Sequence, residues 1–221
     1  MTMFRCILKW LDKLVFTQLV CYAVIVSSLS GCQASAQTNK QEIAMTEAEI
    51  NQKGYEVITL GGGCFWCIEA AYIRIDGVKS AQSGYMGGED STANYYAVSK
   101  GNTNHAEVVQ VIYDPQMIAT EDILDWFWRM HDPTTLNKQG PDVGTQYRSV
   151  IFYHSKAQAE IAEASEKKAA ANFDDSIVTE IQPAMTFHPA EISHQDYYEK
   201  HPDAAYCQMI ITPKLKKLNL E

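Results

Sequence analysis

Two cysteines separated by two residues, Cys64 and Cys67, point most directly to chemistry in this 221-residue sequence. Three consecutive glycines (61–63) precede Cys64, and Phe65 and Trp66 follow it. We predict a strand that ends at the glycines and a helix that begins at Cys64. At a helix start, unpaired N–H groups and the helix dipole favour a thiolate, and the glycines let a substrate approach closely. The pattern therefore predicts a nucleophilic thiol beside an apolar pocket.

Alternative roles for the Cys64/Cys67 pair differ in the further residues that they need. A zinc site needs two more ligands at similar spacing, and the sequence has no second such pair. Haem attachment needs a histidine after the second cysteine, where Ile68 stands. A thioredoxin-like redox pair stays open, because residues i and i+3 share one helical face. A small buried cysteine without reactivity also stays open.

The overall composition is that of a folded, acidic protein. Hydrophobic residues make up 46% and charged residues 20%, which argues against intrinsic disorder. The formal net charge of −9 argues against a nucleic-acid partner, because binding to phosphates needs clustered Lys and Arg. Six cysteines are too few for a disulfide-dense scaffold of this length.

The N-terminal segment resembles a secretory signal. Arg5, Lys9 and Lys13 precede residues 14–29, which carry no charge. That stretch is shorter than the about 20 residues of a spanning helix, and an uncleaved anchor helix is the alternative. Residues 29–32 (LSGC) then resemble the lipobox of bacterial lipoproteins, in which the cysteine, here Cys32, is acylated.

This resemblance sets the expected domain boundaries and location. We expect a signal peptide of the lipoprotein type at 1–31, a polar tether at 32–53 and one catalytic domain at 54–221. Acyl chains on Cys32 would attach the protein to a membrane on the periplasmic side of the bacterial cell envelope.

The domain mixes predicted strands and helices without a regular βαβα alternation, which favours an α+β two-layer sandwich. Hydrophobic patterning predicts strands at 55–60, 78–86, 107–113, 148–153 and 177–181. It predicts helices at 64–75, 155–172 and 193–200, and a further helix that Thr120 caps. Two long turn-rich connections, 87–104 and 131–146, are candidates for functional loops.

The segment Gly63-Cys64-Phe65-Trp66 resembles the active-site signature of the A-type peptide methionine sulfoxide reductases. The resemblance continues in the family's order over about residues 55–215, through 84–88, 101–109, 131–134, 140–149, 194–198 and 206–207. It implies a two-layer domain of the ferredoxin-like or α/β-roll type. It also implies reduction of the S epimer of methionine sulfoxide, free or in proteins, to methionine, which repairs oxidised proteins.

The resemblance also implies roles for particular residues. Cys64 is the nucleophile and Glu107 is the acid that protonates the leaving oxygen. Glu107 shares a strand face with Val109 and Val111, so burial would raise its pKa. Tyr95 and Tyr147 match the positions at which the family has hydroxyl donors to the sulfoxide oxygen.

Further family positions concern the loop and the substrate pocket. Asp142 matches the family's acid on the long loop, where it would organise hydrogen bonds. Phe65 and Trp66 would hold the S-methyl group of the substrate. We expect neither a metal nor a bound cofactor.

After attack, a second thiol must condense with the Cys64 sulfenic acid. Cys207 is the first candidate, because it lies near a C-terminal end that we expect to be mobile. Cys67 is the second, since many relatives have glycine at that position.

The disulfide needs an external dithiol of the thioredoxin type. Because cytosolic thioredoxin cannot reach an exported enzyme, we expect a thioredoxin-like envelope protein or a membrane electron relay. The alternative function is a thiol–disulfide oxidoreductase that uses Cys64 and Cys67.

Overall fold

The structure, a computed structural model, describes residues 45–221. The predicted signal peptide, Cys32 and most of the predicted tether lie outside the described residues. The described end of that tether forms helix α2 (Glu47–Lys53), which starts at a capping box between Thr46 and Glu49 and ends at Gly54. In residues 45–221, no helix has the length and apolar character that crossing a membrane requires.

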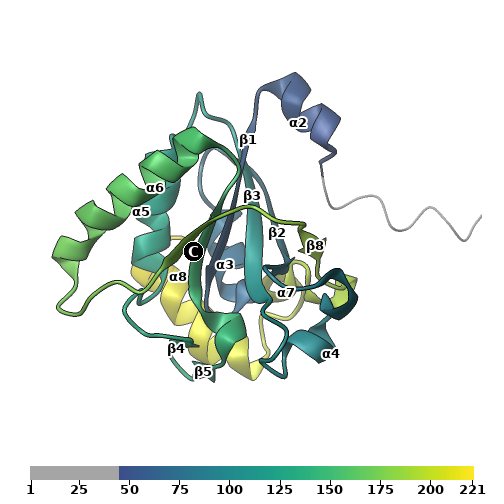
Figure 1. Ribbon diagram of the computed structural model, residues 1–221. Helices are drawn as coiled ribbons and strands as arrows, with labels where there is room; N and C mark the ends of the chain where they lie inside the picture. Colours follow the sequence, from purple (N-terminus) through teal and green to yellow (C-terminus); the bar gives the residue numbers. More distant parts are fainter. Residues whose placement is uncertain (1–44) are drawn as a thin grey trace, which may run out of the picture. The chain divides into compact units, whose positions relative to one another are not determined.

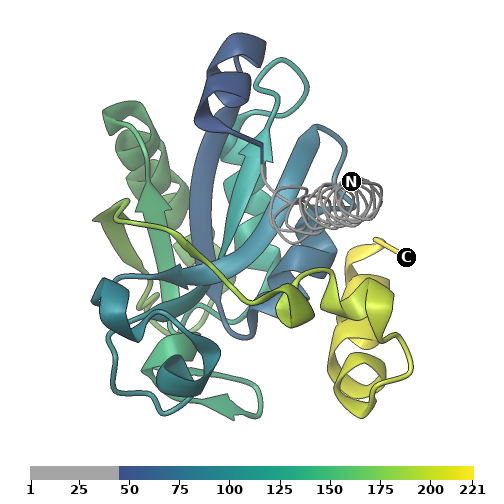
Figure 2. The ribbon, with the colours of Figure 1, turned by 90° about the vertical axis from the view of Figure 1, so that its right-hand side faces the viewer.

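A six-stranded sheet forms the centre of the domain (Figures 1 and 2). Its strands are β1 (Glu56–Gly62), β2 (Val78–Met86), β3 (Ala106–Tyr113), β6 (Ser149–Tyr153), β7 (Glu180–Pro183) and β8 (His188–Pro189). Their spatial order is β7-β6-β1-β3-β2-β8. Neighbouring strands are antiparallel, except that β6 and β7 are parallel. A separate hairpin pairs β4 (Lys138–Gln139) with β5 (Asp142–Val143).

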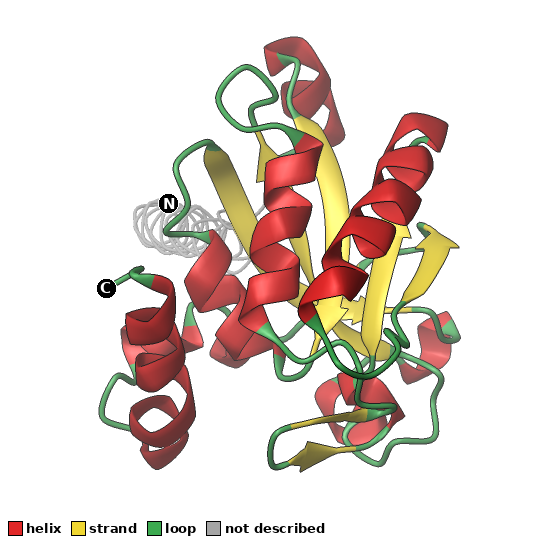
Figure 3. Ribbon diagram, turned by 90° about the vertical axis from the view of Figure 1, so that its left-hand side faces the viewer, coloured by secondary structure: helices red, strands yellow, loops and turns green. Residues whose placement is uncertain are grey.

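The longer helices cover one face of the sheet, as Figure 3 shows. The helices of the domain are α3 (Phe65–Tyr72), α4 (Tyr95–Val98), α5 (Thr120–Met130), α6 (Lys156–Ala169), α7 (Tyr197–Lys200) and α8 (Thr212–Leu218). Short 3-10 turns are η1 (Asp90–Thr92), η2 (Thr145–Tyr147), η3 (Ala170–Asn172) and η4 (Ile192–His194). A π-helix, η5 (Cys207–Ile211), leads directly into α8.

The main core lies between these helices and the sheet. Val109 and Val111 of β3 point into it, together with Leu60 of β1, Ile68 of α3 and Phe127 of α5. All five side chains are buried, and removal of such apolar area from water is the main stabilising term. The arrangement of one sheet and one helical layer confirms the predicted two-layer α+β sandwich.

The opposite face of the sheet carries a smaller core. Val108, Val150 and Phe152 form it, and Phe187 packs on it from outside. Phe187 belongs to residues 184–197, which we call the strap. The strap runs across the sheet to β8 at the edge beside β2 (Figure 1) and continues into η4.

The strand before Cys64 is longer than the sequence predicts. The prediction that the glycines end it was wrong, because β1 continues through Gly62, which pairs with Ser149 of β6. A Cβ atom at Gly61 would lie 2.9 Å from the Glu107 carbonyl oxygen, and one at Gly62 would lie 3.0 Å from the His131 ring. Glycine is needed here for close packing rather than for chain reversal.

Other predicted boundaries also need correction. Helix α3 ends at Tyr72 rather than at residue 75, and Ala119 rather than Thr120 is the N-cap of α5. The Thr120 hydroxyl instead hydrogen-bonds the Tyr113 hydroxyl at 2.7 Å.

Towards the C-terminus, the strand predicted at 177–181 is β7, Glu180–Pro183. The helix predicted at 193–200 is divided into η4 and α7 by Asp196, whose φ is 52°. The chain is helical again over residues 205–218, where Leu215 and Leu218 are buried.

Candidate active site

The Cys64 thiol lies where β1 gives way to α3. Cys64 is the N-cap residue of that helix, and its side chain is 7% exposed. Gly63 has a φ of 95°, which favours glycine and turns the chain from the strand into the helix. The first backbone N–H groups of a helix have no intrahelical acceptor, so a negative charge at Cys64 is stabilised there.

Cys67 lies one helical turn from Cys64, and its Sγ lies 3.9 Å from the Tyr206 hydroxyl. The neighbouring Cys64 thiol lowers the pKa of Cys67 to about 7, whereas burial raises the pKa of Cys64. In such a pair the proton belongs to both groups, so the pair releases its first proton near neutral pH. The resulting negative charge is available for attack beside the α3 N-terminus.

Glu107 is buried beside this thiol pair. Its side chain is 2% exposed, and its Oε2 accepts a hydrogen bond of 3.1 Å from the Phe65 backbone N–H. Burial raises the pKa of Glu107 to about 8, with a further contribution from the Asp142 carboxylate. Glu107 therefore carries a proton at neutral pH and can act as an acid.

Tyr95 and Tyr147 reach the same site from α4 and η2. Burial raises the pKa of both phenols, and the proximity of the ionisable groups Glu107 and Cys64 raises it further. Both hydroxyls therefore stay protonated and can donate hydrogen bonds. The neighbouring Tyr96 is 74% exposed, and its ring contacts the Lys100 ammonium at 3.8 Å.

An aromatic wall stands beside the nucleophile. The Trp66 ring stacks on Tyr197 with centroids 3.7 Å apart, and on His194 at 5.6 Å. His194 in turn stacks on Tyr95 at 4.2 Å, and Phe65 lies 5.7 Å from the His194 ring. These flat apolar faces suit a methyl group bound to sulfur.

Asp142 is connected to the site by Tyr206, a residue to which the sequence alone assigned no role. The Tyr206 hydroxyl donates a hydrogen bond of 2.7 Å to Asp142 Oδ2 and lies 3.9 Å from Cys67 Sγ. Glu191 was also missed: its two carboxylate oxygens accept from the Tyr95 N–H and the Tyr85 hydroxyl, each at 2.9 Å. For Tyr206, the only signal in the sequence was its position directly before Cys207.

The third cysteine of the described residues is Cys207. It is 0% exposed as the first residue of η5, which packs against α3. Burial and the nearby Cys67 thiol raise its pKa. Cys64, Cys67 and Cys207 are all free thiols.

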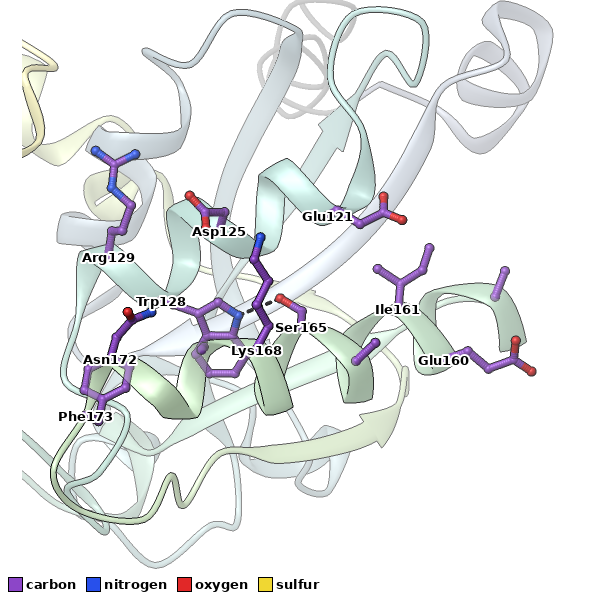
Figure 4. A pocket seen from close by; sticks show the side chains of 13 residues that line it. Glu121, Asp125, Trp128, Arg129, Glu160, Ile161, Ser165, Lys168, Asn172 and Phe173 are labelled. Atoms are coloured by element: carbon purple, nitrogen blue, oxygen red, sulfur yellow. Dashed lines mark hydrogen bonds between the residues drawn. The ribbon is translucent and has the colours of Figure 1, made fainter.

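Away from the Cys64 site, a groove lies between α5 and α6. This groove has a volume of about 720 Å³, and Figure 4 shows Trp128 on its floor, where Nε1 donates to Ser165 Oγ at 2.8 Å. None of the predicted site residues lines it. Within residues 45–221, no cluster of His, Cys, Asp and Glu side chains could hold a metal ion.

Comparison with known proteins agrees with this geometry. Residues 56–221 match the family described as peptide methionine sulfoxide reductase. A relative of that name from Natronomonas pharaonis is 54% identical over 160 residues, which cover 72% of this chain and 90% of the relative. A relative of the same name from Leptospira borgpetersenii is 49% identical over 162 residues, covering 73% and 92%.

Solved structures give the same result. The reduced form of Mxr1 from Saccharomyces cerevisiae has a TM-score of 0.69 at 37% identity, covering 76% of this chain and 94% of that one. Methionine sulfoxide reductase A of Corynebacterium diphtheriae has a TM-score of 0.62 at 36% identity, covering 69% and 78%. This chain therefore belongs to the peptide methionine sulfoxide reductase family.

Proposed function

We propose that this protein reduces the S epimer of methionine sulfoxide, free or within proteins, to methionine, and so repairs oxidised proteins. The observation that carries the proposal is the buried Glu107 carboxyl group, which accepts a hydrogen bond from the Phe65 N–H directly after Cys64. Family membership supports the same reaction.

In the first step, the Cys64 thiolate attacks the sulfoxide sulfur. Glu107 supplies a proton to the sulfoxide oxygen, and the hydroxyls of Tyr95 and Tyr147 hydrogen-bond it as the S–O bond weakens. The attack joins the Cys64 sulfur to the substrate sulfur. The protonated oxygen is then transferred to the Cys64 sulfur as this S–S bond breaks, which leaves Cys64 as a sulfenic acid and releases methionine. The substrate sulfur is thereby reduced by two electrons and the Cys64 sulfur is oxidised by two.

In the second step, a thiol condenses with the sulfenic acid to form a disulfide and water. The sequence favoured Cys207, but the geometry supports Cys67 as the resolving thiol. Cys67 lies one helical turn from Cys64 on α3, and the Tyr206 hydroxyl lies 3.9 Å from its sulfur. Cys207 is fully buried at the start of the helical segment η5.

In the third step, an external dithiol of the thioredoxin type reduces the disulfide to restore both thiols. The signal-like N-terminus and the lipobox resemblance at Cys32 support a lipid-anchored protein in the bacterial periplasm. An exported enzyme would draw its electrons from a thioredoxin-like envelope protein or a membrane relay.

The test is an epimer-resolved assay. The purified protein is incubated with the two separated epimers of a blocked methionine sulfoxide and dithiothreitol, and methionine is quantified. We expect loss of the S epimer alone. Loss of neither epimer, or equal loss of both, would contradict the proposal.

The pKa of about 7 at Cys67 would also suit a thiol–disulfide oxidoreductase. That second candidate predicts reduction of insulin disulfides without any turnover of sulfoxide. It leaves the buried Glu107 and the two tyrosine hydroxyls without a role.

A further inference from the structure

The Arg148 side chain connects three segments that are far apart in the sequence. Its Nε donates to Glu180 Oε2 of β7 at 3.0 Å, and its Nη1 donates to the Thr145 carbonyl oxygen of η2 at 3.0 Å. Its Nη2 donates to the Asn104 carbonyl oxygen at 3.1 Å. The Arg148 side chain is only 12% exposed, so these charge-assisted hydrogen bonds are largely shielded from water.

Two of these partners lie next to residues of the proposed reaction. Thr145 begins η2, which ends at Tyr147, a donor to the sulfoxide oxygen. Asn104 lies two residues before β3, whose second residue is the acid Glu107. Because Arg148 directly follows Tyr147, its guanidinium joins the backbone beside the hydroxyl donor to the backbone beside the acid.

The turn that Arg148 reaches has a backbone conformation that is unfavourable by itself. Asn104 has a φ of 61°, in the left-handed region that residues with a side chain rarely adopt. Gly87, directly after β2, has a φ of 100°, and a Cβ atom there would lie 3.0 Å from Arg148 Nη2 and 3.3 Å from the Asn104 oxygen. The guanidinium therefore lies against the turn after β2 as well as the turn before β3.

Neutral hydrogen bonds attach η2 to another part of the site. Thr145 Oγ1 donates to the Gly101 carbonyl oxygen at 2.9 Å, and Gln146 Nε2 donates to the Ser99 carbonyl oxygen at 3.4 Å. Both acceptors follow α4, the helix that begins at Tyr95. These contacts join η2 to the loop after α4. Arg148 adds the attachment to the turn before β3, and with it the link to the acid.

We propose that Arg148 is a positioning residue that holds the Tyr147 hydroxyl and the Glu107 carboxyl group in a fixed relative position, so that both reach the same sulfoxide oxygen. This inference rests on the proposed function, in which Glu107 protonates that oxygen and Tyr147 donates to it. Arg148 bonds two backbone carbonyl groups and Glu180 rather than the reacting groups, so it acts through Tyr147. Because hydrogen bonds to the oxygen strengthen in the transition state, loss of this alignment slows the chemical step more than it weakens substrate binding.

The experiment uses three variants of the full chain. Arg148→Met removes all three donors and keeps an unbranched apolar side chain. Arg148→Lys keeps the charge but loses the planar fork that bonds two carbonyl oxygens at once. Glu180→Gln is the matched control, because it removes the charge opposite Arg148 and leaves both carbonyl contacts in place.

A double-mutant cycle shows whether Arg148 acts through Tyr147. We expect Arg148→Met to lower the single-turnover rate with the S epimer about tenfold in the wild-type chain but less than about twofold in the Tyr147→Phe chain, because the hydroxyl that Arg148 positions is already absent there. A general loss of structure would lower both rates equally. A tenfold loss in both chains, or no loss in either, would overturn the proposal.

The other two variants test which property of Arg148 matters. Arg148→Lys should lose at least about threefold in rate, and Glu180→Gln should stay within about twofold of wild type. A wild-type rate in Arg148→Lys would mean that only the positive charge is needed. A tenfold loss in Glu180→Gln would assign the effect to the ion pair with β7, and either result would contradict the positioning role.

A measurement without substrate separates this proposal from the proposed function. Hydrogen–deuterium exchange followed by mass spectrometry reports the opening of η2 and of the turn before β3, at the hydrogen-bonded N–H groups of Tyr147 and His105. Exchange at both should be about tenfold faster in Arg148→Met and unchanged in Glu180→Gln. If the wild type reduces neither epimer, the proposed function fails, but the exchange still decides whether Arg148 holds the two turns. Unchanged exchange in Arg148→Met would refute the positioning role.

Discussion

The site around Cys64 and the groove between α5 and α6 differ in where their ionisable groups lie. At the site, Glu107 and the thiol pair are buried and lie within reach of one another. In the groove, the charged side chains are exposed on the helix surfaces around an apolar floor. The comparison teaches that an open hollow of about 720 Å³ does not mark the reactive site here. The reactive site is marked instead by buried titratable groups beside a nucleophile.

The largest predicted effect comes from the nucleophile. Cys64→Ser removes the thiol at the N-cap of α3 that attacks the substrate sulfur, so kcat/KM for the S epimer should fall by at least about 10⁴-fold. Steady-state kinetics with dithiothreitol measures this. A residual activity within tenfold of wild type would move the chemistry away from Cys64.

The next effect comes from the acid. Glu107→Gln keeps the shape and a hydrogen-bond acceptor for the Phe65 N–H but cannot donate a carboxyl proton, so single-turnover rates should fall by about 10²–10³-fold. The effect should be largest near neutral pH.

The pH profile of the wild type carries the same test. The single-turnover rate should rise through about pH 7, as the thiol pair ionises, and fall above about pH 8, as Glu107 loses its proton. The sign follows from burial, which raises the Glu107 pKa and so keeps the acid form up to that pH. In Glu107→Gln the falling limb should vanish, and its persistence would exclude Glu107 as its source.

A smaller loss is expected for the hydroxyl donors. Tyr147→Phe removes one donor to the sulfoxide oxygen and should lower the single-turnover rate by about 10–10²-fold. Tyr96→Phe is the matched control, because that hydroxyl belongs to an exposed ring that contacts the Lys100 ammonium. Equal rates for the two variants would mean that Tyr147 does not touch the reacting oxygen.

The smallest effect on activity is expected in the groove. Trp128→Phe keeps an aromatic ring on the groove floor but loses the Nε1 hydrogen bond to Ser165. Stability should fall by about 1 kcal/mol, which lowers the melting temperature by a few degrees. The kcat/KM should stay within twofold of wild type. A large loss of activity would show that the groove takes part in the reaction.

Local signals in the sequence were sufficient for part of the site. Glycines, a cysteine and two aromatic residues in one run predict a strand-to-helix turn, and the N-cap position of Cys64 follows from it. Alternation along β3 places Glu107 on the same buried face as Val109 and Val111. These features depend on neighbours within a few residues.

Other parts of the site depend on distant packing and were not predictable in this way. Glu191 meets Tyr95 across 96 residues, and Tyr206 meets Asp142 across 64. The hydrophobic periodicity of the sequence gives no information about contacts between residues so far apart in the chain. The C-terminal helices were missed for a related reason: the lysines of α8 are conspicuous, whereas Leu215 and Leu218 become buried only against the rest of the fold.

The central claim is that the Cys64 sulfur takes the sulfoxide oxygen. A single-turnover experiment on the Cys67→Ser/Cys207→Ser double variant, without reductant, tests it directly by methionine quantification and by mass spectrometry after sulfenic-acid trapping. The account predicts one equivalent of methionine per protein and a trapped sulfenic acid at Cys64. No methionine, or an oxidised residue elsewhere with Cys64 unmodified, would contradict it.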